Sequence, residues 1–147
     1  MQKIIYALIA MLVLTCCGCK TSKKSVKNER FPLIGTQWIL ESIDGEDIGT
    51  DFAIRPFIKF DSTSKITGNL GCNSMFGTYE VRKKHKMTIN YTGSTKRLCQ
   101  QISVERNFIK ALKRDINSYE IKGDELILSN DNEEVLRFKG VNLNEVE

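Results

Sequence analysis

The five cysteines are the residues whose chemistry could define this protein, and they fall into two groups. Cys16, Cys17 and Cys19 lie close together near the start of the 147-residue chain, and Cys72 and Cys99 lie in its body. Thiols can accept a lipid, bind a metal or form disulfides. His85 is the only histidine, and there is no dense cluster of carboxylates. Most metal enzymes and acid–base enzymes are therefore poor candidates.

The first 19 residues are typical of a bacterial lipoprotein signal peptide. A lysine near the start precedes an uninterrupted apolar or small stretch at 4–14, which is too short to span a membrane. The cysteines that follow resemble a lipobox, where cleavage leaves a lipidated cysteine at the new N-terminus. Leu14 favours cleavage before Cys17 and Gly18 favours cleavage before Cys19, so both cysteines are candidates. A metal or redox cluster and a secretory signal without lipid are the alternatives.

Residues 20–32 are predicted to be a flexible basic tether that leads to a folded domain over 33–142. Residues 31–147 contain 16 basic and 17 acidic side chains, so the net charge of +4 belongs to the front end. The basic pI is thus no argument for binding nucleic acid, and we expect no such partner. The tether suits either an anionic membrane surface or a solvated spacer. Because no acidic run follows the cysteines, we expect an outer-membrane position that faces the periplasm.

Cys72 and Cys99 are the only cysteines in the body of the chain. Secretion would place them in an oxidising compartment, so a structural disulfide is the favoured prediction. Closing this loop would stabilise the fold by roughly 3.5 kcal/mol. The alternatives are two buried free thiols, or a thiol-dependent redox pair that lacks both CxxC spacing and an adjacent base.

The body shows many short runs in which apolar and polar residues alternate. Such alternation, rich in β-branched and aromatic residues and broken by Gly, Asn and Asp, is typical of half-buried strands. Turns are expected at 122–124 and 130–132. The residues predicted to share the inner faces of these strands are Trp38, Leu40, Ser42, Ile58, Phe60, Ile66, Gly68, Leu70, Tyr79, Val81, Met87, Ile89, Tyr91, Tyr119, Ile121, Leu126, Leu128, Leu136 and Phe138.

One segment has helical periodicity and predicts a helix over 103–115. Ser103 is the expected N-cap, Glu105 would complement the helix dipole, and Asn117 would end the helix. Its apolar stripe consists of Val104, Phe108, Ala111 and Leu112. About eight strands and one packed helix predict a mainly β (α+β) fold, a small antiparallel β-barrel or closed roll, since closure protects the sheet edges.

Residues 82–86 (RKKHK) are predicted to form a hairpin loop. Its basic side chains suit an anion patch, although a solvated tip is the commoner arrangement, and His85 is expected at the surface. Gly68, Gly71 and Gly77 indicate a tight turn, a bulge or close backbone approach. A phosphate-binding loop would need a GK[ST] ending, which is absent.

Two motifs carry a family resemblance: GCN…FGTY at 71–79 and ST…C at 94–99, the latter followed by the predicted helix. With the opening GTQWILESI at 35–43 and GDELIL at 123–128, the chain resembles the META-domain family over roughly 33–140. That family includes the heat-shock HslJ-like lipoproteins. Ser74 and Arg97 depart from its pattern, which puts their local contacts in question. The motif residues are Gly71, Cys72, Asn73, Phe76, Gly77, Tyr79, Ser94, Thr95 and Cys99.

The resemblance implies a small β-rich, barrel-like domain, usually in secreted or lipoprotein chains, and no established enzymatic activity. A binding or accessory module would contact an envelope protein or a small apolar ligand, because barrel mouths provide pockets. Trp38, Phe76, Tyr79 and Tyr91 could line such a pocket, although core packing is the commoner role of such residues. A stress-related structural protein is a second possibility. We expect no catalytic residues, metal or cofactor, because no base accompanies Cys72.

Overall fold

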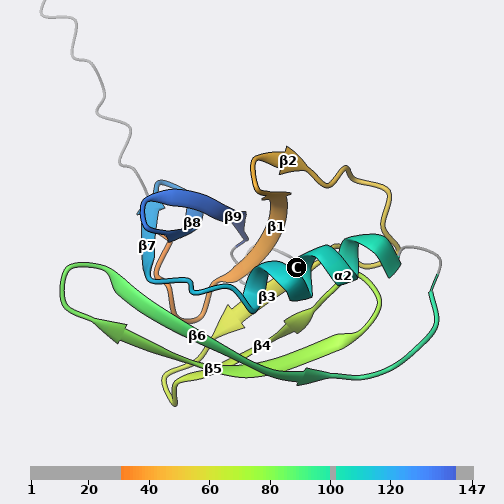
Figure 1. Ribbon diagram of the computed structural model, residues 1–147, viewed down its shortest axis with the longest axis horizontal. Coiled ribbons are helices and arrows are strands. Elements are labelled where there is room, and N and C mark those ends of the chain that lie inside the picture. Colours follow the sequence, from red (N-terminus) through yellow and green to blue (C-terminus); the bar gives the residue numbers. More distant parts are fainter. Residues whose placement is uncertain (1–30, 100–101, 142–147) are drawn as a thin grey trace, which may run out of the picture.

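A computed structural model describes residues 31–99 and 102–141. The predicted signal peptide, the candidate lipidation residues Cys17 and Cys19, and most of the predicted tether lie outside these residues. The described chain forms nine antiparallel strands in one sheet and a single α-helix (Figure 1). The elements are β1 (Gln37–Ile43), β2 (Glu46–Asp47), β3 (Phe57–Phe60), β4 (Lys65–Asn69), β5 (Ser74–Arg82), β6 (Lys86–Ser94), α2 (Ile102–Leu112), β7 (Ser118–Lys122), β8 (Glu125–Asn130) and β9 (Glu133–Val141).

The sheet closes into a ring because β9 pairs with β1 as well as with β8. Eight of the described strands form this ring, and β2 is a two-residue addition that pairs only with the end of β1. The prediction of an antiparallel barrel of about eight strands with one packed helix is confirmed. The sequence pattern did not predict β2, because its two residues are both exposed and show no alternation.

The ring is weakest between β6 and β7. Only Lys86 and Ser118 pair there, flanked by backbone hydrogen bonds from Met87 N–H to Asn117 O (3.2 Å) and from Tyr119 N–H to His85 O (3.0 Å). Beyond Met87, β6 has no strand partner on this side among the described residues. Figure 1 shows α2 lying beside β6 and β1 at this opening. The helix therefore covers the gap that the short β6–β7 pairing leaves.

The barrel interior is filled by large side chains. Trp38, Phe60, Phe108 and Phe138 are almost completely buried, and the rings of Phe108 on α2 and Phe138 on β9 lie 6.0 Å apart. Most predicted inner-face residues belong to this core. Val81 is an exception, because β5 extends past the barrel body to a hairpin tip where it is exposed.

Three details of the helix prediction are wrong. The helix already includes Ile102, so Ser103 is inside it rather than at the non-helical N-cap position. It ends at Leu112 rather than at 115. Asn117 does not end the helix, because its side-chain amide instead donates to Asp131 Oδ1 (2.7 Å) in the β8–β9 turn.

The predicted hairpin loop over 82–86 joins β5 to β6. Lys84 and His85 have φ angles of 61° and 58°, the left-handed conformation that a tight hairpin turn requires. His85 is exposed, and its ring lies 5.4 Å from the ring of Tyr119 on β7. The predicted turns at 122–124 and 130–132 also connect consecutive strands.

Truncating the helix's main core side chain should show how strongly α2 supports the barrel. Phe108→Ala should lower the free energy of unfolding by about 3–5 kcal/mol, because it leaves a cavity against Phe138. Equilibrium urea denaturation followed by tryptophan fluorescence measures this loss. The exposed Arg106→Ala on the same helix is the control and should change stability by less than about 0.5 kcal/mol. Equal effects of the two variants would contradict the assigned packing.

Candidate functional site

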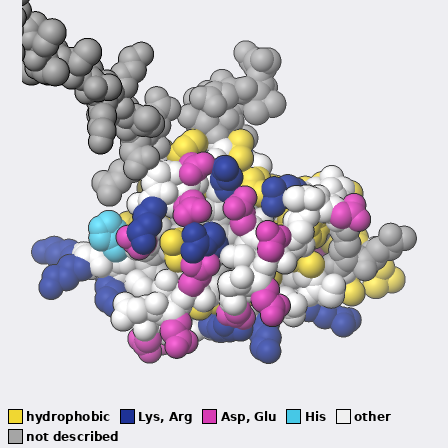
Figure 2. Space-filling model, turned by 90° about the horizontal axis from the view of Figure 1, so that it is seen from above, with side chains coloured by type: hydrophobic (Ala, Val, Ile, Leu, Met, Phe, Trp, Pro, Cys, Tyr) yellow, Lys and Arg dark blue, Asp and Glu magenta, His cyan; other side chains and the backbone are white. Residues whose placement is uncertain are grey.

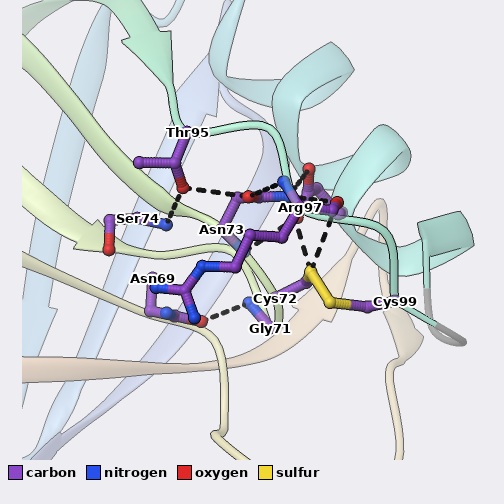
Figure 3. The surroundings of a disulfide bond; sticks show 9 residues. Asn69, Gly71, Cys72, Asn73, Ser74, Thr95, Arg97 and Cys99 are labelled. Atoms are coloured by element: carbon purple, nitrogen blue, oxygen red, sulfur yellow. Dashed lines mark hydrogen bonds between the residues drawn. A yellow bond between two sulfur atoms is a disulfide. The ribbon is translucent and has the colours of Figure 1, made fainter.

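The GCN and ST motifs meet around the side chain of Asn73, which is buried in the loop between β4 and β5 (Figure 3). The Asn73 amide oxygen accepts hydrogen bonds from Thr95 Oγ1 (2.9 Å) and Arg97 N–H (2.7 Å). Its Nδ2 group donates to Arg97 O (3.2 Å) and to Glu105 Oε1 (2.9 Å). One amide side chain thus joins the β4–β5 loop, the segment after β6 and helix α2. We call these residues the Asn73 clamp.

Glu105 is the buried acidic member of the clamp and is only 6% exposed. Besides the Asn73 side chain, its carboxylate accepts a hydrogen bond from Asn73 N–H (3.1 Å). A buried carboxylate is costly unless such donors satisfy it. Glu105 lies in the first turn of α2, as predicted, and the sequence pattern did not indicate that this carboxylate is buried against Asn73.

A sequence signal for this role existed in the helix itself. Glu105, Phe108 and Leu112 follow the i, i+3, i+7 spacing that places residues on one helix face. A charged residue on a buried face needs a polar partner. The spacing alone did not identify that partner, because Asn73 is 32 residues away.

The two departures from the family pattern take part in the clamp through their backbones. Ser74 N–H donates to Thr95 Oγ1 (3.1 Å), and Thr95 N–H donates to Ser74 O (3.0 Å). Arg97 contributes its N–H and carbonyl groups. The side chains of Ser74 and Arg97 are exposed. Because the backbone supplies these contacts, substitutions at either position are compatible with the same clamp.

Cys72 and Cys99 are joined by a disulfide with their Cα atoms 6.1 Å apart. Cys72 directly precedes Asn73, so the covalent bond and the clamp hold the same two loops together (Figure 3). Gly71 adopts a φ of 102°, and its N–H donates to Asn69 Oδ1 (2.8 Å), which shapes the turn that presents Cys72. The immediate consequence of this arrangement is that the disulfide stabilises the two loops.

The remaining motif residues lie along the β5–β6 hairpin rather than in the clamp. A Cβ atom on Gly77 would collide with the backbone oxygen of Asn90, so only glycine fits there. The Tyr79 hydroxyl donates to Asp61 O (2.6 Å), and burial raises its pKa, which keeps the hydroxyl protonated. Ser94 accepts a hydrogen bond from the Tyr91 hydroxyl (2.9 Å). Phe76 is 48% exposed and lines neither the core nor the clamp.

The clamp lacks the groups that nucleophilic or metal chemistry needs. His85 lies at the far end of the β5–β6 hairpin, about 27 Å from the clamp at the usual rise per strand residue. Among the described residues, no group of three or more His, Cys, Asp or Glu side chains is arranged to hold a metal ion. The clamp's amide and carboxylate groups already bind one another, so they serve to fix structure.

Surface grooves, rather than the barrel interior, provide the space for ligands. One groove of about 360 Å³ lies between the β1–β2 hairpin and α2 and includes Ile48, Val104 and Lys110. Arg114 at its edge forms a two-point ion pair with Asp44, with Nη2 and Oδ2 2.7 Å apart. That hydrogen bonding lowers the pKa of the Asp44 carboxyl. A second, more apolar groove of about 340 Å³ lies beside Phe31 and Ile121.

Comparison with known families decides what this fold and motif set represent. Residues 31–142 match the META domain. This chain belongs to the META-domain family. The match covers the whole ring, the helix and the clamp, so the motif residues quoted from the sequence lie within one META domain.

Solved structures agree with the fold. Proteins with structures determined by NMR, one of them from Burkholderia xenovorans, have TM-scores of 0.55 and 0.53 to this chain. Their sequence identities are 22% and 21%, and the matches cover 74% and 71% of this chain and 83% and 88% of theirs. A DUF4847 family protein from Bacteroides vulgatus is 22% identical with a TM-score of 0.49, and the chain spans 57% of that protein's length. No curated protein sequence matches the chain.

The clamp makes a sharp prediction for two asparagine substitutions. Asn73→Asp places a carboxylate against buried Glu105 and should lower the free energy of unfolding by about 3–5 kcal/mol. Asn90→Asp is the control, because Asn90 on β6 is exposed and lies outside the clamp, and it should change stability by less than about 0.5 kcal/mol. Equilibrium denaturation at neutral pH measures both effects. Adding Glu105→Gln to Asn73→Asp should recover part of the loss, and no recovery would contradict direct pairing.

The disulfide should stabilise the domain in addition to the clamp's hydrogen bonds. Replacing both Cys72 and Cys99 by serine should lower the free energy of unfolding by roughly 3–4 kcal/mol at this loop length. Urea denaturation of this variant and of the parent, each with and without reductant, measures the loss. Reductant should destabilise the parent alone. A parent unaffected by full reduction would show that the disulfide contributes little.

Proposed function

We propose that this META-domain chain is a lipid-anchored protein of the bacterial cell envelope that acts as a binding or accessory module without catalysis of its own. The observation that carries the proposal is the use of the motif residues. Asn73 forms hydrogen bonds with Thr95 and with the buried Glu105, and Cys72 is bound to Cys99. The motif therefore builds a rigid scaffold, and function falls to the scaffold's outer surface.

The anchor rests on the sequence before the domain. An apolar stretch at 4–14 leads to Cys17 and Cys19, as in a lipoprotein signal peptide. Several acyl chains on one of these cysteines would hold the protein stably at a membrane. An oxidising envelope compartment is also where a disulfide such as Cys72–Cys99 persists. Among the described residues, no helix has the length and apolar character needed to cross a bilayer.

A ligand would bind at a groove rather than inside the barrel. Trp38 and Tyr79, which could have lined an interior pocket, are packed in the core. The filled interior favours a peptide or an envelope protein as partner over a small apolar ligand enclosed by the barrel. A stress-related role fits a module whose fold is stapled by both a disulfide and a buried polar clamp.

A thiol-dependent redox function is the second candidate, because the Cys99 side of the disulfide is exposed. Such a function needs a base or cation that activates a thiolate. The neighbours that contact Cys72 and Asn73 are backbone, amide and carboxylate groups, and a carboxylate disfavours a nearby thiolate. A structural disulfide is therefore the stronger assignment.

Mass analysis of the protein isolated from membranes tests the proposal. Free thiols are alkylated before digestion, and the N-terminal peptide is examined for acyl chains. We expect an acylated Cys17 or Cys19 and a peptide cross-linked through Cys72 and Cys99. A Cys17→Ser, Cys19→Ser chain is the control and should carry no acyl chains. An unacylated parent protein found in the soluble fraction would contradict the lipid anchor. An alkylated Cys72 would favour the redox function.

A further inference from the structure

The first described residues and the β5–β6 hairpin tip lie at the same end of the barrel. Phe31 and Leu33 line the apolar groove together with His85 from the hairpin and with Tyr119 and Ile121 from β7. Lys83, Lys84 and Lys86 flank His85 in the chain. We call this groove and the three lysines the entry face, because the chain enters the fold there.

The entry face carries three lysines, Lys83, Lys84 and Lys86, that form no ion pair within the described part of the chain. The acidic residues nearest in the β7–β8 hairpin have partners of their own, with Glu120 2.9 Å from Lys122 and Asp124 3.6 Å from Lys139. Figure 2 shows basic side chains projecting at the edge of the molecule next to the histidine.

The shape of the entry face combines these cations with apolar surface. A depression of about 600 Å³ lined by Arg82, Lys83 and Lys86 adjoins the hairpin. Ile34, which follows the lining residue Leu33 in the chain, is a large hydrophobic residue that is 47% exposed. Surfaces that sit at a membrane interface pair lysines, which reach phosphates, with apolar and aromatic side chains at headgroup depth.

The position of the entry face relates it to the proposed anchor. A lipid on Cys17 or Cys19 would be joined to Phe31 by at most 14 residues, which span no more than about 50 Å when fully extended. The tether sequence up to Arg30 adds further basic residues before the fold begins. Negative headgroups attract clusters of this kind within a Debye length of the surface.

We propose that the entry face binds an anionic phospholipid surface, with Lys83, Lys84 and Lys86 on the headgroup phosphates and the Phe31–Ile121 groove against the interface. This inference rests on the proposed function, since the anchor brings the face to the membrane. The domain then lies with its clamp end, at the opposite end of the β5–β6 hairpin, directed away from the bilayer. The groove between the β1–β2 hairpin and α2 remains accessible to partners.

Hydroxyl-radical footprinting of the full protein isolated from membranes tests the orientation. The protein is added to preformed vesicles of phosphatidylcholine alone, or of phosphatidylcholine and phosphatidylglycerol in equal parts. Oxidation of Phe31 and Tyr119 should fall about threefold on the anionic vesicles, with the exposed Phe76 as internal reference. High salt should restore much of the oxidation, because salt screens exposed charges.

Two variants with equal changes in net charge separate the effect of the entry-face lysines from the effect of the protein's total charge. The triple substitution Lys83→Glu, Lys84→Glu, Lys86→Glu should abolish the protection of Phe31 and Tyr119. The control Lys96→Glu, Arg106→Glu, Lys110→Glu changes the charge equally, at the far end of β6 and on α2, and should keep the protection. Equal loss in both variants, or equal protection on phosphatidylcholine alone, would overturn recognition of an anionic surface by this face.

Two further measurements distinguish a membrane-binding face from a small-anion site and test the lipid anchor separately. Protection of Phe31 by soluble glycerophosphoglycerol without vesicles would replace the membrane face by a small-anion site and overturn the proposal. The N-terminal peptide of the same sample reports acylation. An unacylated protein that still shows protection on anionic vesicles would contradict the anchor and support the face. An acylated protein without protection would support the anchor and contradict the face.

Discussion

The buried carboxylate of Glu105 is the constraint on which the rest of the structure depends. Strands β6 and β7 are joined by a single residue pair, which leaves an opening in the ring. Helix α2 covers this opening. The helix can do so only if its charged inward residue is satisfied, because an unpaired buried carboxylate costs several kcal/mol. Asn73 supplies both a backbone and a side-chain donor. Closure of the barrel and satisfaction of one acid are thus coupled.

The family motifs acquire a physical meaning from that coupling. The Asn73 side-chain amide donates a hydrogen bond to the Glu105 carboxylate and at the same time accepts hydrogen bonds from Thr95 and Arg97. Aspartate cannot do this, because at neutral pH it only accepts hydrogen bonds. The disulfide beside Asn73 limits how far the two loops separate when the hydrogen bonds open. The exposed side chains at 74 and 97 are free to vary because only their backbones take part.

The two ends of the β5–β6 hairpin therefore differ in whether their polar and charged groups are bonded within the fold. The clamp end is internally satisfied and rigid, with a covalent bond across it. The entry end carries lysines outside the described ion pairs, an apolar groove and the first described residue of the chain. Groups that are satisfied within the fold stabilise it, whereas charges outside the described ion pairs and exposed apolar surface are available for binding. This division is the basis for proposing that function resides at the surface of the barrel.

The sequence by itself determined the local structure. Alternation in runs such as Trp38–Ser42, and turn residues such as those at 130–132, predicted where most strands lie along the chain, because the two-residue period of a strand is a local property. It also led to the family through motifs whose order is visible without a structure. Only the tertiary structure decided the role of Glu105, the short β6–β7 pairing and the groove that Phe31 and His85 both line. Each depends on residues far apart in the chain, and long-range pairing leaves no local periodicity to read.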